Sequence, residues 1–205
     1  SGGLRRRDFL ATGAAALGLG ITGFPAILRA QAAPVKIGLI HPVSGFIAFS
    51  GTQCRAGAEM AIADINAAGG IKSMGGAMLE AMLADSQGKP DIGAAIAQKW
   101  IDEEGVDAIV GGSASSIALA VQTMMAEKKK PYMLAGTASS SLTNDACTPY
   151  SMQWVLDTYS LPKATAKSLV GAGEDTWFFI TVDYTFGKQW QADTTKFIED
   201  AGGKV

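Results

Sequence analysis

The sequence predicts an α/β fold in which helices flank both faces of a parallel sheet. Short apolar segments alternate with helical patterns through residues 35–155, the order expected when helical crossovers join parallel strands. Turns rich in Gly, Ser and Ala follow the third and fourth apolar segments. Hydrophobic residues make up 48% of the 205-residue chain, so the chain has the material for a buried core.

The strands and helices follow one another in a regular order. Strands are predicted at 35–40, 77–84, 108–110, 131–134 and 151–155, and helices at 52–68, 90–104 and from Ser115 onward. The helix that opens at Ser115 carries apolar residues at 117, 120, 121 and 124, which share one helical face. Glycines at 69–70 and at 105 end the first two helices.

Residues 156–205 begin the same pattern again. We predict a helix at 160–172, a strongly apolar strand at 177–182 and a helix at 188–201. A sheet with so few strands does not close a core by itself. We therefore expect a first lobe at 33–155, a truncated second lobe at 156–205, and a longer protein of which this chain is the N-terminal part.

Residues 1–32 have the pattern of an export signal peptide. Three arginines at 5–7 precede an apolar stretch at 11–27, and Ala30-Gln31-Ala32 supplies a cleavage site. Arg6-Arg7-Asp8-Phe9-Leu10 is similar to the twin-arginine export signal, with the general secretory route as the alternative. No later segment is apolar for long enough to span a bilayer, so we expect no stable membrane anchor after cleavage.

The charge pattern argues against a nucleic-acid partner. Residues 33–205 contain 13 Lys and Arg against 18 Asp and Glu, whereas nucleic-acid-binding domains carry basic patches. The one basic cluster, Lys128–Lys130, lies at a predicted helix end, where cations interact favourably with the helix dipole.

Neither a cofactor nor a metal is expected. The string Gly18-x-Gly20-x-x-Gly23 matches a dinucleotide fingerprint, but it follows no strand. His41 is the only histidine, and no partners lie at metal-ligand spacing. We therefore predict that His41 packs within its loop.

The turn after the third strand is suited to binding an anion. Ligands in open α/β sheets bind beyond the carboxyl ends of the strands. Gly111–Ala114 is a small-residue turn, and the following helix opens at Ser115 and Ser116. Main-chain N–H groups and hydroxyls at the positive end of a helix favour a carboxylate. The alternative is that Ser115 or Ser116 is only an N-cap.

An enzyme is the least favoured function. A serine hydrolase would use Ser113, Ser115 or Ser116, with His41 as the sole candidate base. The string GGSASS lacks both the G-x-S-x-G elbow and the lysine of a phosphate-binding loop. We therefore expect a binding protein and no catalytic residues.

Five segments carry a resemblance to a known family. They are VKIGLIHPVSGFIAFSG, AGAEMAIADINAAGGI, VGGSASS, GTASSSLT and DYTFGKQW, in this order behind an export signal. Over residues 34–205 the chain resembles the type I periplasmic solute-binding proteins, in the Leu/Ile/Val-binding branch that serves ABC importers. The resemblance implies a periplasmic protein with two lobes, which closes by hinge motion around a solute in the cleft between them.

The resemblance also assigns residues to the binding site. The first lobe would hold the solute carboxylate with two loops, and Ser139 is the favoured hydroxyl donor. The assigned positions are Ala114, Ser115 and Ser116 after the third strand, and Gly136, Thr137, Ala138 and Ser139 after the fourth.

Aromatic side chains are expected near the body of the solute. Phe186 stands where the second lobe of the family offers an aromatic residue, with packing of its own loop as the alternative. Ser50 occupies a place that is often aromatic, and Phe49 lies beside it. The acidic residue that meets an amino-acid ammonium would follow Val205, so an amino acid and an aromatic acid both stay open.

Partners follow from the same resemblance. An importer receptor would bind a small carboxylate and dock on the permease subunits of an ABC transporter. A ligand sensor of the same fold is the alternative, because lobe architecture does not separate the two roles.

Cys54 and Cys147 are the only cysteines. Export permits a disulfide, but sequence does not supply the distance that a bridge requires. Whether the two residues pair stays open at this point.

Overall fold

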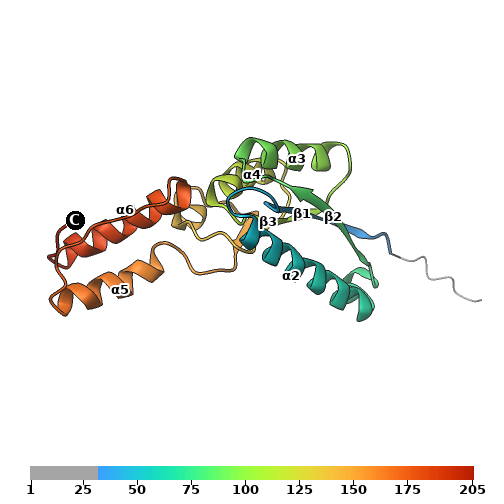
Figure 1. Ribbon diagram of the computed structural model, residues 1–205. Coiled ribbons are helices and arrows are strands. Elements are labelled where there is room, and N and C mark those ends of the chain that lie inside the picture. Colours follow the sequence, from blue (N-terminus) through green and yellow to red (C-terminus); the bar gives the residue numbers. More distant parts are fainter. Residues whose placement is uncertain (1–31) are drawn as a thin grey trace, which may run out of the picture. The chain divides into compact units, whose positions relative to one another are not determined.

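The computed structural model describes residues 32–205 and contains one five-stranded sheet. All neighbouring strands are parallel, in the order β2-β1-β3-β4-β5 (Figure 1). The strands are β1 (Val35–His41), β2 (Leu79–Asp85), β3 (Ala108–Gly111), β4 (Tyr132–Leu134) and β5 (Ser151–Gln153). The predicted α/β class is confirmed, while the predicted export segment lies outside the described residues except for Ala32.

Helices cover both faces of the sheet. They are α2 (Ala48–Ala67), α3 (Pro90–Asp102), α4 (Ser115–Glu127), α5 (Ser160–Gly171) and α6 (Thr185–Asp200), with short 3-10 turns η1 (Lys72–Met74) and η2 (Ser140–Thr143). α2 lies on one face, and α3 and α4 lie on the other (Figure 1). None of the helices within residues 32–205 has the length and apolar character needed to cross a membrane.

Alternation along β1 explains the two layers. Ile37 and Leu39 pack in the cluster on the α2 side, and Ile40 belongs to the larger cluster with α3 and α4, because successive strand residues point to opposite faces. Trp100 of α3 lies so close to the sheet that a Cβ on Gly38 would be 2.7 Å from its ring. The glycine therefore permits the close packing of α3.

Helix α2 differs from its prediction. It begins at Ala48, four residues before the expected start, and Gly51 fits under the main-chain carbonyl of Pro42, where any Cβ would collide. Ile62 contacts the sheet, whereas Ala61 and Ile65 are exposed. Only a narrow face of this helix therefore packs on the sheet.

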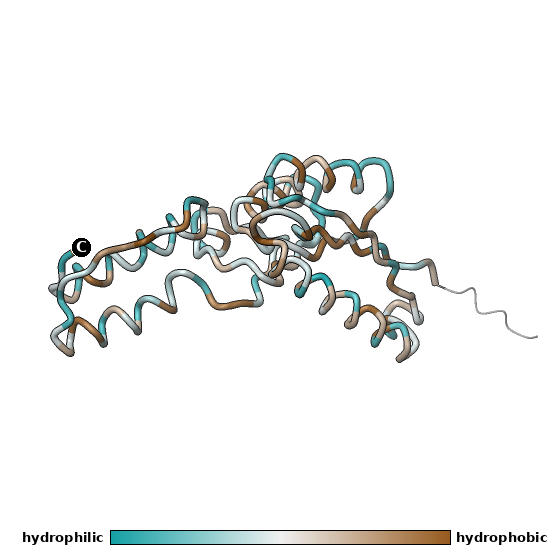
Figure 2. The backbone as a smooth tube through the Cα atoms, in the orientation of Figure 1, coloured by the Kyte–Doolittle hydropathy of each residue, from teal (hydrophilic) through white to brown (hydrophobic). Residues whose placement is uncertain are grey.

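The apolar run 177–182 was predicted as a strand, and this prediction is wrong. Among the described residues the only pairing here is an isolated bridge between Thr176 and Lys204. Phe178 and Ile180 are 88% and 96% exposed, so this apolar stretch is uncovered (Figure 2). A strand needs a hydrogen-bonding neighbour along its length, and among residues 32–205 only the main-chain N–H of Trp177, at the start of this segment, donates to the main chain of a neighbouring segment, at Lys204.

Candidate functional site

The loops that follow β3 and β4 lie side by side at the carboxyl edge of the sheet. Their strands pair directly, with Gly111 opposite Leu134. A Cβ on Gly136 would lie 3.8 Å from the Cα of Ser113 and 2.8 Å from the Sγ of Cys54 in α2. Both predicted binding loops therefore meet at one place, beside the first turns of α2.

Several main-chain donors at this place have no partner. Among residues 32–205, the N–H groups of 136–139 and those of Ser113 and Ala114 donate no hydrogen bond. The N–H groups in the first turn of an α-helix also lack intrahelical acceptors, and no side chain caps α4. Unpaired N–H groups at the positive end of a helix attract an anion.

The serine hydroxyl groups of the two loops differ in burial and in their partners. The N-cap of α4 is Ala114, without a side-chain bond, so the N-cap interpretation of Ser115 and Ser116 is wrong. Ser115 is buried and Ser116 is half-buried. The Oγ of Ser139, the favoured donor, is buried and lies 2.8 Å from the Oγ of Ser141.

Thr137 has the unpaired hydroxyl of this region. Its Oγ1 is buried and has no hydrogen-bond partner among residues 32–205. It lies close to Gly112, where a Cβ would be 2.6 Å away. A buried polar group without a partner lowers the stability of the fold. The Thr137 hydroxyl therefore has an unused capacity for a hydrogen bond.

A cleft of about 760 Å³ connects the loop after β4 with α6. Its lining contains Gly136, Ala138, Phe186 and Trp190, together with residues from 154–161: Trp154, Val155, Leu156, Asp157, Ser160 and Leu161. This volume lies within the range of about 300–1,000 Å³ found for small-molecule sites. Three of the predicted site residues, Gly136, Ala138 and Phe186, thus face one cavity.

The other predicted residues do not line this cleft. Ala114, Ser115, Ser116, Thr137 and Ser139 are absent from its lining, and all but the half-buried Ser116 are buried. In the first turn of α2, Ser50 is half-buried and Phe49 points to solvent with 82% of its surface exposed.

Sequence reasoning missed much of the apolar wall. Trp154 and Leu156 follow β5 directly, and Trp190 lies one turn after Phe186 on α6. The spacing of four from Phe186 to Trp190 places both on one helix face, which was a usable signal. Nothing local distinguishes Trp154 from an ordinary linker residue.

The cleft contains no cationic side chain among its lining residues. Asp157 is the one charged residue there, and its Oδ1 accepts hydrogen bonds from the N–H groups of Tyr159 and Ser160 at 3.2 Å and 2.6 Å. Burial raises the pKa of Asp157 and these hydrogen bonds lower it, with a net decrease. A bound anion would therefore depend on main-chain donors and not on a salt bridge within this part of the cavity.

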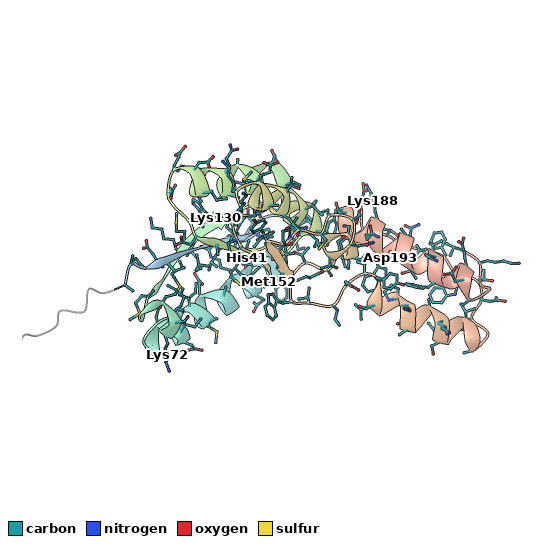
Figure 3. All side chains as sticks on the ribbon, turned by 180° about the vertical axis from the view of Figure 1, so that it is seen from behind. His41, Lys72, Lys130, Met152, Lys188 and Asp193 are labelled. Carbon is teal, nitrogen blue, oxygen red and sulfur yellow. The ribbon has the colours of Figure 1, made fainter. Side chains whose placement is uncertain are left out.

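His41 contacts Ser113 in the loop after β3. It ends β1 and is fully buried (Figure 3), with its Nδ1 3.3 Å from the Oγ of Ser113. Its Nε2 has no partner among residues 32–205. Burial, assisted by the charge of Arg55, lowers the pKa of His41 to about 4, so the ring is neutral near pH 7.

Metal and disulfide sites are not formed in the described residues. No group of three or more His, Cys, Asp or Glu side chains within 32–205 is arranged to hold a metal ion. Cys54 is half-buried and Cys147 is exposed, and both are free thiols. The structure therefore contains no Cys54–Cys147 bridge.

Comparison with protein families gives one match over nearly all described residues. The model of the family described as periplasmic binding protein matches residues 34–205. The leucine-, isoleucine-, valine-, threonine- and alanine-binding protein of Pseudomonas aeruginosa is 30% identical over 188 residues, which cover 91% of this chain and 49% of that protein.

Solved structures with the same fold include two that are more than 25% identical to this chain over the aligned residues. A periplasmic binding protein from Burkholderia mallei has a TM-score of 0.78 and 40% identity, over 85% of this chain and 46% of its own. An ABC-transporter solute-binding protein from R. palustris, in complex with 4-hydroxybenzoate, has a TM-score of 0.71 and 27% identity, over 84% and 45%. The chain thus spans less than half the length of each of these relatives.

Proposed function

The chain belongs to the type I periplasmic binding protein family, and on that premise we propose that it is part of an exported receptor for an ABC importer. The receptor binds a small carboxylate in the cleft between two lobes. Residues 33–155 form the first lobe, and residues 156–205 begin the second. Export follows the twin-arginine signal at Arg6-Arg7, and the receptor delivers its solute to the permease subunits in the inner membrane.

The unpaired main-chain donors are the observation that carries this proposal. N–H groups at 136–139 and around Ser113 and Ala114 make no hydrogen bond among the described residues, and Gly136 and Ala138 face the cleft. A carboxylate can accept several such bonds, and a charged acceptor makes each of them stronger. The donors therefore match an anionic group and leave a neutral ligand less well held.

Apolar walls support a solute with a hydrophobic body. Trp154, Leu156, Phe186 and Trp190 surround the cavity, and burying such surface contributes roughly 25 cal/mol per Å². Among the relatives, one is named for leucine, isoleucine, valine, threonine and alanine, and another holds 4-hydroxybenzoate. We propose the same range here, namely a branched-chain or other amino acid, or an aromatic acid.

The Ser113–His41 contact is the strongest argument for an enzyme, and its surroundings argue against catalysis. His41 is fully buried, its Nε2 has no acid partner among residues 32–205, and Ser113 is also buried. A catalytic triad needs an orienting carboxylate and a nucleophile that the substrate can reach. We therefore assign the pair a structural role.

A thermal unfolding series tests the binding function. The protein expressed from its whole gene is heated with L-leucine, L-valine, benzoate or 4-hydroxybenzoate, and with L-leucinamide and benzamide as counterparts that lack the carboxylate. A ligand at 100 times its dissociation constant stabilises by about 2.7 kcal/mol, so at least one acid should raise the melting temperature while its amide does not. No shift with any acid, or equal shifts with acid and amide, would contradict the proposal.

A second experiment separates the receptor from the hydrolase. Ser113→Ala removes the hydroxyl and keeps the main-chain N–H. A receptor retains its affinity for the stabilising compound within about threefold, because the lost hydroxyl faces His41. Turnover of an ester substrate by the wild type that disappears in Ser113→Ala would support the hydrolase instead. A sensor would bind the solute equally well. Deleting the gene of a sensor would leave uptake of the solute unchanged, whereas deleting the gene of an importer receptor would reduce it.

A further inference from the structure

The carboxylate of Asp193 connects α6 to Ser140 and Thr158, which lie in segments that follow β4 and β5. Its Oδ2 accepts hydrogen bonds from Thr158 Oγ1 at 2.8 Å and from Ser140 Oγ at 2.9 Å. Its Oδ1 accepts one from Gln189 Nε2 at 3.1 Å. Asp193 is labelled on α6 in Figure 3. Hydrogen bonds to an ionised acceptor are stronger than those between neutral groups.

The two hydroxyl donors, Ser140 and Thr158, lie next to the loop after β4, which is part of the candidate site. Ser140 follows the unpaired N–H groups of 136–139 directly, and its own N–H donates to Thr158 Oγ1 at 3.0 Å. Thr158 is fully buried, and its N–H donates to the carbonyl of Ala138 at 2.8 Å. Asp193 is therefore one hydrogen bond away from the loop that lines the cleft.

The same face of α6 carries the aromatic wall. Phe186, Trp190 and Asp193 are separated by four and three residues, which brings them to one side of a helix. Phe186 and Trp190 line the cleft, so the contact of Asp193 with Ser140 and Thr158 fixes the side of α6 that faces the solute.

Packing of α6 alone does not require a carboxylate at this position. The buried residues of α6 are Gly187, Thr194 and Ile198, and α6 packs along α5. Apart from Gln189, the partners of Asp193 lie outside the helix. A partly buried carboxylate costs desolvation, which these three hydrogen bonds offset.

We propose that Asp193 is a positioning residue of the cleft, which holds the aromatic face of α6 opposite the main-chain donors of 136–139. This inference rests on the proposed binding function, because it assigns Asp193 a role in solute affinity without contact to the solute. The Asp193 side chain then fixes the position of the apolar side chains of α6 relative to the N–H donors of 136–139.

Three variants test this role in the protein expressed from its whole gene. Asp193→Ala deletes the acceptor, while Asp193→Asn keeps the shape and can place a neutral amide oxygen where Oδ2 accepts from both hydroxyls. Asp200→Ala is the matched control, since Asp200 lies on the same helix and is exposed, with Lys196 as its partner at 2.7 Å. Affinity is measured by calorimetry for L-leucine, benzoate and 4-hydroxybenzoate, and main-chain hydrogen exchange is measured without ligand.

We expect Asp193→Ala to weaken binding about tenfold, because two hydrogen bonds to a charged acceptor are lost. Asp193→Asn should stay within about threefold of the wild type, and Asp200→Ala should be unchanged. Without ligand, Asp193→Ala should speed exchange of the Thr158 N–H and of the first turns of α6, but not that of α3.

Other outcomes overturn the inference or the function separately. If Asp193→Ala binds like the wild type and exchanges like it, Asp193 has no positioning role, while the proposed function stands. If the wild type binds none of the probes, the binding function fails, and hydrogen exchange still decides whether Asp193 places α6. Should Asp193→Ala not fold, Ser140→Ala removes one of the two donors, with an expected loss of about threefold in affinity and faster exchange of the Thr158 N–H; no change in either would contradict the role.

Discussion

The ring of Phe46 meets the ring of Tyr184 edge-on, with 5.4 Å between centroids and an interplanar angle of 67°. Phe46 comes from the loop between β1 and α2, and Tyr184 directly precedes α6. Tyr184 stacks on Phe186 at 5.9 Å, and Phe186 lies 5.5 Å from Trp190. A row of four aromatic rings therefore runs from the loop after the first strand to the wall of the cleft.

Replacing Phe46 with alanine should weaken ligand binding and leave the fold intact. Phe46 is 66% exposed, so little core is lost, but the edge-to-face contact contributes about 0.5–1.5 kcal/mol. We expect a decrease in affinity of about three- to tenfold. Phe49→Ala is the control, because Phe49 is 82% exposed and forms no aromatic pair among residues 32–205. Equal affinities of the two variants would show that the aromatic row does not contribute.

Replacing Thr137 with valine should separate stability from binding. Within residues 32–205 the buried Oγ1 of Thr137 has no partner, so an apolar group of the same shape should raise the free energy of unfolding by about 1 kcal/mol. We also expect about threefold weaker binding or more, because the lone hydroxyl lies within the donor loop. Denaturant unfolding and calorimetry measure the two effects, and Thr137→Ser should retain the affinity. Unchanged affinity in Thr137→Val would exclude a role of this hydroxyl in binding.

Two glycine-to-alanine changes should have opposite effects. A Cβ at Gly136 would be 2.8 Å from the Sγ of Cys54, and overpacking of this kind costs about 1–3 kcal/mol. At Gly57, inside α2, nothing lies within 4 Å, and alanine should stabilise the helix by about 0.5–1 kcal/mol. Melting temperatures check both signs. The second change Cys54→Ala should restore stability to Gly136→Ala; failure to do so would place the strain elsewhere.

Acid should destabilise the protein through His41. The pKa of this buried ring falls from 6.5 to about 4 on folding, so the unfolded state binds the proton first as the pH decreases. The neutral ring gives its full contribution above pH 6.5, and that contribution is lost between pH 6.5 and 4, up to about 3 kcal/mol.

The variant His41→Gln isolates this effect. His41 is the only histidine of the chain, so the variant should lack the component of acid sensitivity that falls between pH 6.5 and 4. Urea unfolding of both proteins at several pH values gives the difference. Parallel pH profiles would mean that His41 is not shielded from water as the structure indicates.

The sequence predicted the sheet because its features are local. Each strand is a short apolar run followed by a turn and a helix, and parallel pairing of β3 with β4 then brings their loops together. The resemblance, and not a local pattern, assigned Gly136, Ala138 and Phe186 to the site, and the structure places all three on one cleft. It also adds the aromatic partners of Phe186.

The remaining features depend on contacts between distant segments. The segment 177–182 has the composition of a buried strand, but among the described residues it pairs with a neighbouring segment only at its start, at Lys204. The contact of the Ser139 hydroxyl with that of Ser141 is likewise visible only in the structure. Trp154 and Asp193 carry no local signal, because their roles arise only when α6 packs beside the loop after β4.

The central claim is that main-chain donors hold the carboxylate of the solute, and a crystal structure of the complex tests it most directly. The crystals would contain the acid that gives the largest thermal shift. We predict a carboxylate oxygen within about 3.2 Å of a main-chain nitrogen of residues 136–139 or of the first turn of α4, with the body of the solute against Phe186 and Trp190. A carboxylate held only by lysine or arginine side chains, or bound away from these loops, would contradict the account.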